Sequence, residues 1–290
     1  MKVYVVDAFI DGAQGGNAAG VVLDSDQLNP THMQAIAAEM GLSETVFMSR
    51  SESAEFRTDF FTPNKRVPDC GHATVAAFSL LSAENRLRGT SSSKETVDGV
   101  REIILEGDSI FMAQRAPVFT PTTDRHHAIA ASLGISPDGF LAPPEVVNTG
   151  VNFLMIALKN EAAVKELEPN QEAIAAISDE LDLIGYYVFS TQASKEGRHA
   201  GARMFAPSYG IPEESATGMA AGPCACYLNQ RLGVTDETIY IEQGRMMETP
   251  SPSLLTVRLE ISDKAITGLR VGGIGKVNRT VDIESLVAHT

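Results

Sequence analysis

The sequence predicts an α+β protein built from two similar lobes, and an internal repeat is the main reason. The pattern F-x-P-x-x-x-[VI]-P-[DE] occurs at residues 61–69 and again at residues 205–213, almost half of the 290-residue chain apart. Each copy is followed within a few residues by a glycine in a run of small residues. Solenoid repeats are shorter, at roughly 20–50 residues. We therefore expect two lobes, each delivering a proline–acid–glycine segment to the start of a helix.

The first half of the chain is expected to contain short strands and two helices. Strands are predicted at residues 3–9, 19–23, 44–48 and 55–61, where β-branched and aromatic residues gather. Pro30 suits the first turn of a helix that Gly41 can end. A second helix, at residues 71–81, has almost no polar face after Thr74, so it should be buried on all sides. The Ser- and Thr-rich residues 90–94 are predicted to form a loop.

The second half is expected to follow the same plan. Strands are predicted near residues 146–158, 186–191, 200–205, 239–243 and 254–261, and an Ala- and Cys-rich helix from about residue 218 to residue 232. Residues 116–121 resemble a crossover between the lobes. The expected domains are therefore an N-terminal lobe at 1–115, with a crossover to about residue 147, and a C-terminal lobe at 116–290. An active-site cleft is expected between them.

Composition excludes several classes of protein. The net charge is −14, from 37 acidic and 23 basic residues, and no basic cluster occurs, so nucleic acid is not an expected partner. The longest apolar run, at residues 151–158, is too short to span a bilayer, and the N-terminus lacks the apolar core of a signal peptide. Three cysteines are an odd number in a long chain, which favours reduced thiols in a cytoplasmic protein.

The two predicted helix starts are candidate anion sites. A helix N-terminus offers unpaired backbone N–H groups and partial positive charge, which can hold a carboxylate without Arg or Lys. Glycine at both starts lets a ligand approach closely. The alternative is that these glycines only let two buried helices begin and pack. The candidate positions are Gly71, His72, Ala73, Thr217, Gly218 and Met219.

Several side chains around these helix starts could move a proton. They are Glu44, Asp69, His72, Glu213 and Glu214. A carboxylate partly withdrawn from water is a stronger base, and a proton shift beside a carboxyl or enamine group needs one base within reach of both carbons. Simpler interpretations stay open. Glu44 could be a strand-edge charge or a cap, His72 could point to solvent, and Asp69 and Glu213 could be solvent-facing acids beside a proline turn.

A set of segments resembles the signatures of the PhzF-like, phenazine-biosynthesis family. These are L-S-E-T-V-F at residues 42–47, C-G-H-A-T at residues 70–74, and residues 203–218 with their A-T-G ending. Residues 7–9 and 16–22, which include Asn17, resemble that family's first hairpin, and the Asn148-Thr149-Gly150 segment resembles the start of its second half. The match runs over nearly the whole chain in the expected order.

The resemblance implies a diaminopimelate-epimerase-like fold, with two pseudo-symmetric lobes that are each a curled, mostly antiparallel sheet around a central buried helix. It implies a cofactor-independent isomerase or epimerase that moves a proton on a small, cyclic amino-carboxylate substrate, and usually a homodimer. In the family's pattern the acid/base role falls on Glu44, and the histidine falls on His72. We expect His72 and Asp69 to hydrogen-bond the substrate or tune Glu44, and Glu214 to guide or relay a proton. Asn17 joins the expected substrate-binding positions.

Two departures from the phenazine enzyme's pattern bear on the substrate. This chain has Glu214 where that enzyme has an aspartate, and Met219 where it has a serine directly after the A-T-G. The first change moves an acid by one methylene, and the second removes a polar contact, because a thioether cannot donate a hydrogen bond. We infer that the proton-transfer groups survive while the phenazine precursor is not the substrate. The alternative function is a catalytically inactive ligand-binding or protein-interaction member of the same fold.

Thiol and metal chemistry are both disfavoured. Related amino-acid epimerases use two facing thiols, but here Cys70 at one helix start corresponds to Thr217 at the other. Cys224 and Cys226 lie about 10–13 Å further along that helix, at 1.5 Å per residue, and should be buried packing residues. The six histidines form no H-E-x-x-H pattern and the cysteines no C-x-x-C pattern, so no metal site is expected.

Overall fold

The computed structural model describes residues 1–283, which form two compact units. Unit 1 comprises residues 1–112 and the described chain from Gly272 onward, and unit 2 comprises Ala113–Val271. The boundaries fall inside strands β8 (Ser109–Arg115) and β17 (Ala265–Asp282). The sequence placed everything after residue 115 in one lobe, whereas residues 272–283 belong to unit 1 because β17 pairs with β1. Residues 284–290 of that expected lobe lie outside the described chain.

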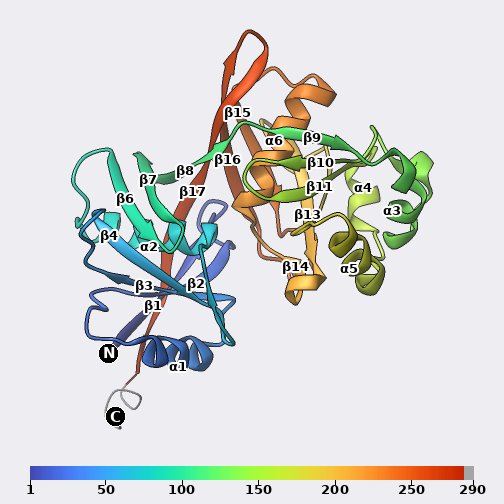
Figure 1. Cartoon of the computed structure of the whole chain (residues 1–290). Helices are drawn as coiled ribbons and strands as arrows, with labels where there is room; N and C mark the ends of the chain where they lie inside the picture. The colour runs from blue at the N-terminus through green and yellow to red at the C-terminus, as the bar shows by residue number, and fades with distance from the viewer. Residues whose placement is uncertain (284–290) are drawn as a thin grey trace. The chain divides into compact units, whose positions relative to one another are not determined.

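Unit 1 is a set of strands around one helix (Figure 1). Besides β8 and part of β17, its elements are β1 (Lys2–Ala8), β2 (Asn17–Val22), α1 (Pro30–Met40), β3 (Glu44–Ser49), β4 (Phe56–Phe61), β5 (Arg66–Val67), α2 (Gly71–Ala83), β6 (Ser91–Thr96) and β7 (Gly99–Glu106). Hydrogen-bonded pairs link them in the order β17–β1–β2–β3–β4–β6–β7–β8. Strand β8 in turn pairs with β17, so this order closes on itself.

Helix α2 lies inside unit 1 because its sequence offers no polar face. Every residue from His72 to Leu81 is buried, and the helix contacts β1, β2 and β3. Helix α1 instead covers one side of the unit and buries Met33, Ile36 and Ala37. The side chain of Asn29 caps its start, and Gly41 ends it with a φ of 61°, a conformation that glycine adopts without strain. Both helix predictions in this half are confirmed.

Unit 2 has a mixed sheet and a second buried helix. Its elements are β9 (Val118–Pro121), η1 (Thr123–Arg125), α3 (His126–Ser132), η2 (Pro137–Gly139), β10 (Glu145–Asn148), β11 (Asn152–Ala157), α4 (Glu161–Lys165), α5 (Gln171–Glu180), β12 (Gly185–Ser190), β13 (Ala200–Ala206), η3 (Pro207–Tyr209), β14 (Ile211–Glu214), α6 (Gly218–Leu232), β15 (Thr238–Gln243) and β16 (Ser253–Ser262). Helix α6 matches its prediction and contacts β10, β11 and β16.

The strand pairings of the two units follow the same alternation. In unit 1 the pairs β1–β2, β3–β4 and β6–β7 are antiparallel, while β2–β3 and β4–β6 are parallel. In unit 2 the pairs β10–β11, β12–β13 and β15–β16 are antiparallel, while β11–β12 and β13–β15 are parallel. The chain is therefore a mixed α/β protein in which the repeated sequence pattern accompanies a repeated order of pairing. Among the described residues, no helix is long and apolar enough to cross a membrane.

Two segments differ from their sequence-based interpretation, and one strand was not predicted. The predicted loop at residues 90–94 is largely β6, which pairs with β4 on one side and with β7 on the other. Its alternate residues Ser92, Lys94 and Thr96 are buried. The predicted crossover at residues 116–121 contains β9, which pairs with β10. The glycine-rich stretch after residue 265 is the long strand β17, where a Cβ added at Gly272 would lie 2.3 Å from the carbonyl oxygen of Ile110. Glycine there permits close strand packing rather than a turn.

Strand β2 imposes a similar constraint beside β3. A Cβ added at Gly20 would lie 2.6 Å from Oγ1 of the buried Thr45, which is its partner in the β2–β3 pair. We expect Gly20→Ala to lower the free energy of unfolding by about 1–3 kcal/mol, because overpacking forces strands apart or side chains off their rotamers. Urea unfolding checks this. Gly139→Ala is the control, since its added Cβ would meet Ile135 at an ordinary 3.6 Å. Equal stability of the two variants would contradict the prediction.

Ionisable groups buried in unit 2 predict alkaline sensitivity. Burial raises the pKa of Cys226 and of Tyr186 to about 12, and it also raises the pKa values of Cys224, Tyr187 and Tyr227. In the unfolded chain thiols ionise near pH 8.5 and phenols near pH 10. Above pH 8.5 the unfolded state therefore loses protons that the folded state keeps, so the free energy of unfolding falls as pH rises.

The expected slope is about 1.4 kcal/mol per pH unit for each such group once the pH exceeds its unfolded pKa. Urea midpoints at pH 7.5, 9 and 10 measure it. The Cys224→Ala/Cys226→Ala double variant should show a shallower fall between pH 9 and pH 10, because only the tyrosines then contribute. A slope that the double variant leaves unchanged would contradict the assignment to the thiols.

Candidate active site

Glu44 opens strand β3 and lies at the edge of the unit 1 interior. The chain reaches it from the end of α1, and parallel pairing of β3 with β2 sets Glu44 opposite Ala19. Its side chain is 16% exposed, so the carboxylate is largely but not completely withdrawn from water.

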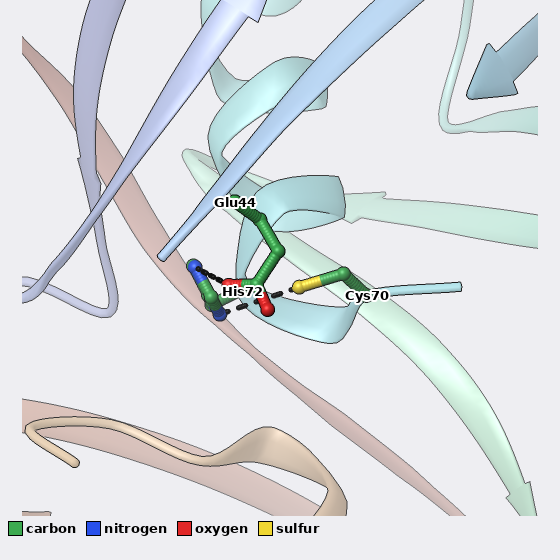
Figure 2. A group of neighbouring side chains, drawn as sticks. All are labelled: Glu44, Cys70 and His72. Carbon is green, nitrogen blue, oxygen red and sulfur yellow. Dashed lines mark hydrogen bonds and ion pairs between the residues drawn. The ribbon is translucent and has the colours of Figure 1, made fainter. Parts of the chain in front are cut away.

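His72 stands in the first turn of α2, and its ring contacts both Glu44 and Cys70 (Figure 2). The ring Nε2 lies 3.3 Å from Oε2 of Glu44 and 3.3 Å from Oγ of Ser43. On the opposite side, Nδ1 lies 3.4 Å from Sγ of Cys70. The imidazole is 6% exposed, so the interpretation of His72 as a solvent-facing residue is wrong. Its burial follows from the all-round burial of α2.

This arrangement suits hydrogen bonding across the ring. One ligand atom from each of Glu44, Cys70 and His72 lies within 4.8 Å of the others, a spacing that a metal ion could bridge. However, Glu44 and Cys70 contact different nitrogens of the same ring, and a metal ion would occupy one of them. In a neutral imidazole one nitrogen donates and the other accepts. Oγ of Ser43 and Sγ of Cys70 are hydrogen-bond partners of Nε2 and Nδ1, while Oε2 of Glu44 lies at ion-pair distance from Nε2.

Asp69 is bound on one side and open on the other. Its Oδ1 accepts a hydrogen bond of 2.7 Å from the backbone N–H of Cys70. The same oxygen forms an ion pair with Nζ of Lys94. Its side chain is 37% exposed, whereas that of Lys94 is 1% exposed. Burial lowers the pKa of Lys94, and the charge of Asp69 opposes that shift. Asp69 is therefore a partly exposed acid that an ion pair links to a lysine in the interior of unit 1.

The remaining unit 1 candidates surround the start of α2. Cys70 is its N-cap residue and forms no side-chain capping bond. A Cβ added at Gly71 would meet one atom within 4 Å, Cε of Met112 at 3.8 Å. Ala73 is buried, and the largely buried Asn17 begins β2.

In unit 2 a buried amide holds the start of α6. Nε2 of Gln243 donates to the carbonyl oxygen of Glu214 at 2.7 Å and to Oγ1 of Thr217 at 3.1 Å. Its Oε1 accepts from the backbone N–H of Thr217 at 3.1 Å and from the hydroxyl of Tyr187 at 3.0 Å. Thr217 also donates to Oε2 of Glu214 at 2.5 Å. The structure therefore brings together Glu214 and Thr217, which the sequence had named, and adds Gln243.

The other unit 2 candidates have separate surroundings. The carbonyl oxygen of Gly218 accepts a 3.0 Å hydrogen bond from Nε2 of Gln114. Met219 is 38% exposed. Glu213 is not a solvent-facing acid, because it forms a bidentate pair with the buried Arg203 at 2.7 and 2.8 Å. The cleft expected between the two helix starts stays a prediction.

Sequence reasoning missed Lys94 and Gln243. The alternation in β6 of Ser92, Lys94 and Thr96 was a signal for a strand with one buried face, but the Ser/Thr-rich composition suggested a loop. Gln243 ends a strand that the sequence did predict. Nothing local to Gln243 distinguishes it from a surface amide, because its partners come from β12 and from residues 214–217.

The fold and sequence match known isomerases along nearly the whole chain. The Salmonella typhimurium protein named "uncharacterized isomerase YddE" is 35% identical over 235 residues, which are 78% of each chain. The trans-2,3-dihydro-3-hydroxyanthranilate isomerase of Pseudomonas aeruginosa is 31% identical over 94% of this chain and 96% of its own. A solved PhzF-family phenazine biosynthesis protein from Bacillus anthracis covers 98% of this chain and 99% of its own, with a TM-score of 0.89 and 25% identity.

These likenesses to proteins named isomerases support an isomerase. The family model described as "Phenazine biosynthesis-like protein" (PhzC-PhzF) matches residues 6–278. The chain belongs to this family.

The Gln243 network predicts a local stability effect. We expect Gln243→Leu to lower the free energy of unfolding by at least about 2 kcal/mol, because it leaves buried groups of Thr217, Glu214 and Tyr187 without their partner, at about 1–3 kcal/mol for each unmet group. Tyr187→Phe is the matched control and should cost about 1 kcal/mol, since it removes a single hydrogen bond. Thermal and urea unfolding measure both. Equal losses would show that Gln243 does not hold the turn.

Proposed function

We propose that the two units are the pseudo-symmetric lobes of a diaminopimelate-epimerase-like, cofactor-independent isomerase whose acid/base is Glu44. The observation that carries the proposal is the 3.3 Å contact between Oε2 of Glu44 and Nε2 of His72 at a site largely withdrawn from water. A general base works best when a neighbouring group fixes its orientation. The ring of His72 supports such a role for Glu44, although the sequence places the two residues 28 positions apart.

The proposed reaction is a proton shift with one base. Glu44 removes a proton from a carbon activated by a neighbouring carboxylate or enamine group. The electron pair left on that carbon delocalises into the activated system, and Glu44 returns the proton to a second carbon. One carboxylate can serve both carbons because it holds the proton between the two steps, so no external acid or oxidant is required. The product is an isomer of the substrate.

Backbone amides at the helix starts would hold the substrate anion. The first N–H groups of α2, at Gly71, His72 and Ala73, carry the partial positive charge of a helix start and could stabilise charge that develops during the shift. We assign the amides at Thr217, Gly218 and Met219 of α6 the same kind of role, and Glu214 the guidance of a proton. Asp69 and Asn17 are assigned to substrate contact.

The proposed substrate class is a small amino-carboxylate, in which a ring places the activating group beside the reacting carbon. The Pseudomonas aeruginosa relative is named for a hydroxylated dihydroanthranilate, a molecule of that class. Glu214 and Met219 differ from the phenazine enzyme's pattern, and Met219 cannot donate the hydrogen bond that a serine would. We therefore propose a different member of the class for this chain. A homodimer and a cytoplasmic location belong to the same proposal.

A catalytically inactive binding protein is the less favoured function. Several relatives that match most of this chain are named isomerases. A chain that had lost its chemistry would have no reason to hold a carboxylate against a buried imidazole, because burying such groups opposes folding unless they interact well.

Proton exchange with solvent tests the assignment of Glu44. Wild-type protein is incubated in D₂O with a panel of small cyclic and linear amino-carboxylates, and loss of C–H signals is followed by NMR. We expect exchange in at least one compound and its loss in Glu44→Gln, because an amide cannot take up the proton. Glu39→Gln, an exposed position on α1, is the matched control and should retain full exchange.

Retained exchange in a folded Glu44→Gln protein would overturn the assignment. Binding of a panel compound without any exchange by wild-type protein would favour the inactive binding protein instead.

A further inference from the structure

Lys94 is a fully buried cation that the sequence did not single out. It lies in β6, on the face that points into unit 1, and its side chain is 1% exposed. Its Nζ forms an ion pair with Oδ1 of Asp69 and donates a 2.7 Å hydrogen bond to Oγ1 of Thr74. It also lies 5.0 Å from the centre of the Phe60 ring. Burying a lysine is costly, so contacts this specific indicate a task beyond filling space.

Both partners of Lys94, Asp69 and Thr74, form hydrogen bonds with the backbone of a single residue, Cys70. Oδ1 of Asp69 accepts from the backbone N–H of Cys70 at 2.7 Å, and Oγ1 of Thr74 donates to its carbonyl oxygen at 2.7 Å. Lys94 therefore closes a ring of hydrogen bonds through Asp69, Cys70 and Thr74. Its ammonium supplies donors to both acceptors at once, which a neutral apolar side chain could not do.

Cys70 is the N-cap of α2, and its own side chain reaches His72. Because Cys70 and His72 are two residues apart at the helix start, fixing the backbone of Cys70 also fixes the first turn that carries the imidazole. The contact of 3.4 Å between Sγ of Cys70 and Nδ1 of His72 then orients the ring toward Glu44. The chain of contacts runs without interruption from Lys94 to the proposed acid/base.

We propose that Lys94 is a positioning residue of the isomerase site: by holding Asp69 and Thr74 against the two backbone groups of Cys70, it fixes the start of α2 and thereby the approach of His72 to Glu44. The inference rests on the proposed function, because it assigns Lys94 to the same site. Lys94 itself is 1% exposed and acts through its neighbours rather than on the substrate.

The decisive variant is Lys94→Met, which keeps the length of the side chain and removes its charge. We expect kcat for C–H exchange to fall roughly 10²-fold with KM little changed, as a small displacement of positioned groups can do. In the free protein, the ring ¹⁵N resonances of His72 should also shift. Arg231→Met is the control, since it removes the cation of another ion pair, the one with the largely buried Glu145 in unit 2. It should lower stability while leaving kcat and His72 unchanged.

The double variant Lys94→Met/Asp69→Asn tests whether Lys94 acts through Asp69. An asparagine oxygen can still accept from the N–H of Cys70 but needs no cation beside it. We expect the double variant to recover part of the shift of the His72 ring resonances caused by Lys94→Met in the free protein, and strong non-additivity between the two changes. A double variant whose His72 resonances stay as displaced as in Lys94→Met would show that Lys94 does not work through Asp69 and would overturn the positioning role.

Should Lys94→Met fail to fold, Thr74→Val provides the test, because it breaks the link to the carbonyl of Cys70 without leaving a charge unpaired. A smaller fall in kcat with a shift of the His72 resonances supports the proposal. Wild-type kcat and wild-type His72 resonances in folded Lys94→Met or Thr74→Val overturn it. If wild type shows no exchange, or Glu44→Gln retains it, the proposed function fails, while the His72 resonances of the free variants still decide the role of Lys94.

Discussion

The all-round burial of α2 is the constraint on which unit 1 depends. A helix without a polar face must be enclosed by strands, and its first turn then ends inside the protein, where four backbone N–H groups need partners. Water serves this purpose for a surface helix. Here Asp69 and Thr74 bind the N–H and the carbonyl oxygen of Cys70, the residue before the helix, and Lys94 of β6 donates to Thr74.

The same constraint explains why the candidate site lies where it does. The partial positive charge of a helix start favours an anion, and side chains held at a buried helix start are shielded from bulk water. Glu44 arrives from the strand beside β2, and His72 arrives on the helix itself. Electrostatic interactions between such groups are stronger than on the surface, so a small number of contacts can direct a proton.

In unit 2 a neutral amide side chain binds the residues at the start of the buried helix α6. Where unit 1 uses the charged pair of Lys94 and Asp69, the start of α6 is held by the amide of Gln243, which both donates and accepts. The acid of the repeated proline segment is also treated differently, since Glu213 pairs with Arg203 from the neighbouring strand β13. The two units therefore share an order of strand pairing but differ in the residues that satisfy their buried polar groups.

The sequence by itself determined the repeat, the three principal helices and the family, because periodicity, caps and short signatures are local. It also named Glu44, His72 and Cys70, although it left the exposure of His72 open. Two strands and the roles of two buried side chains could be assigned only from the tertiary structure. Strand β6 was mistaken for a loop because serine and threonine favour turns, and β17 went unrecognised because its glycines serve close packing. The roles of Lys94 and Gln243 depend on partners distant in sequence, and only folding brings those partners within hydrogen-bonding distance.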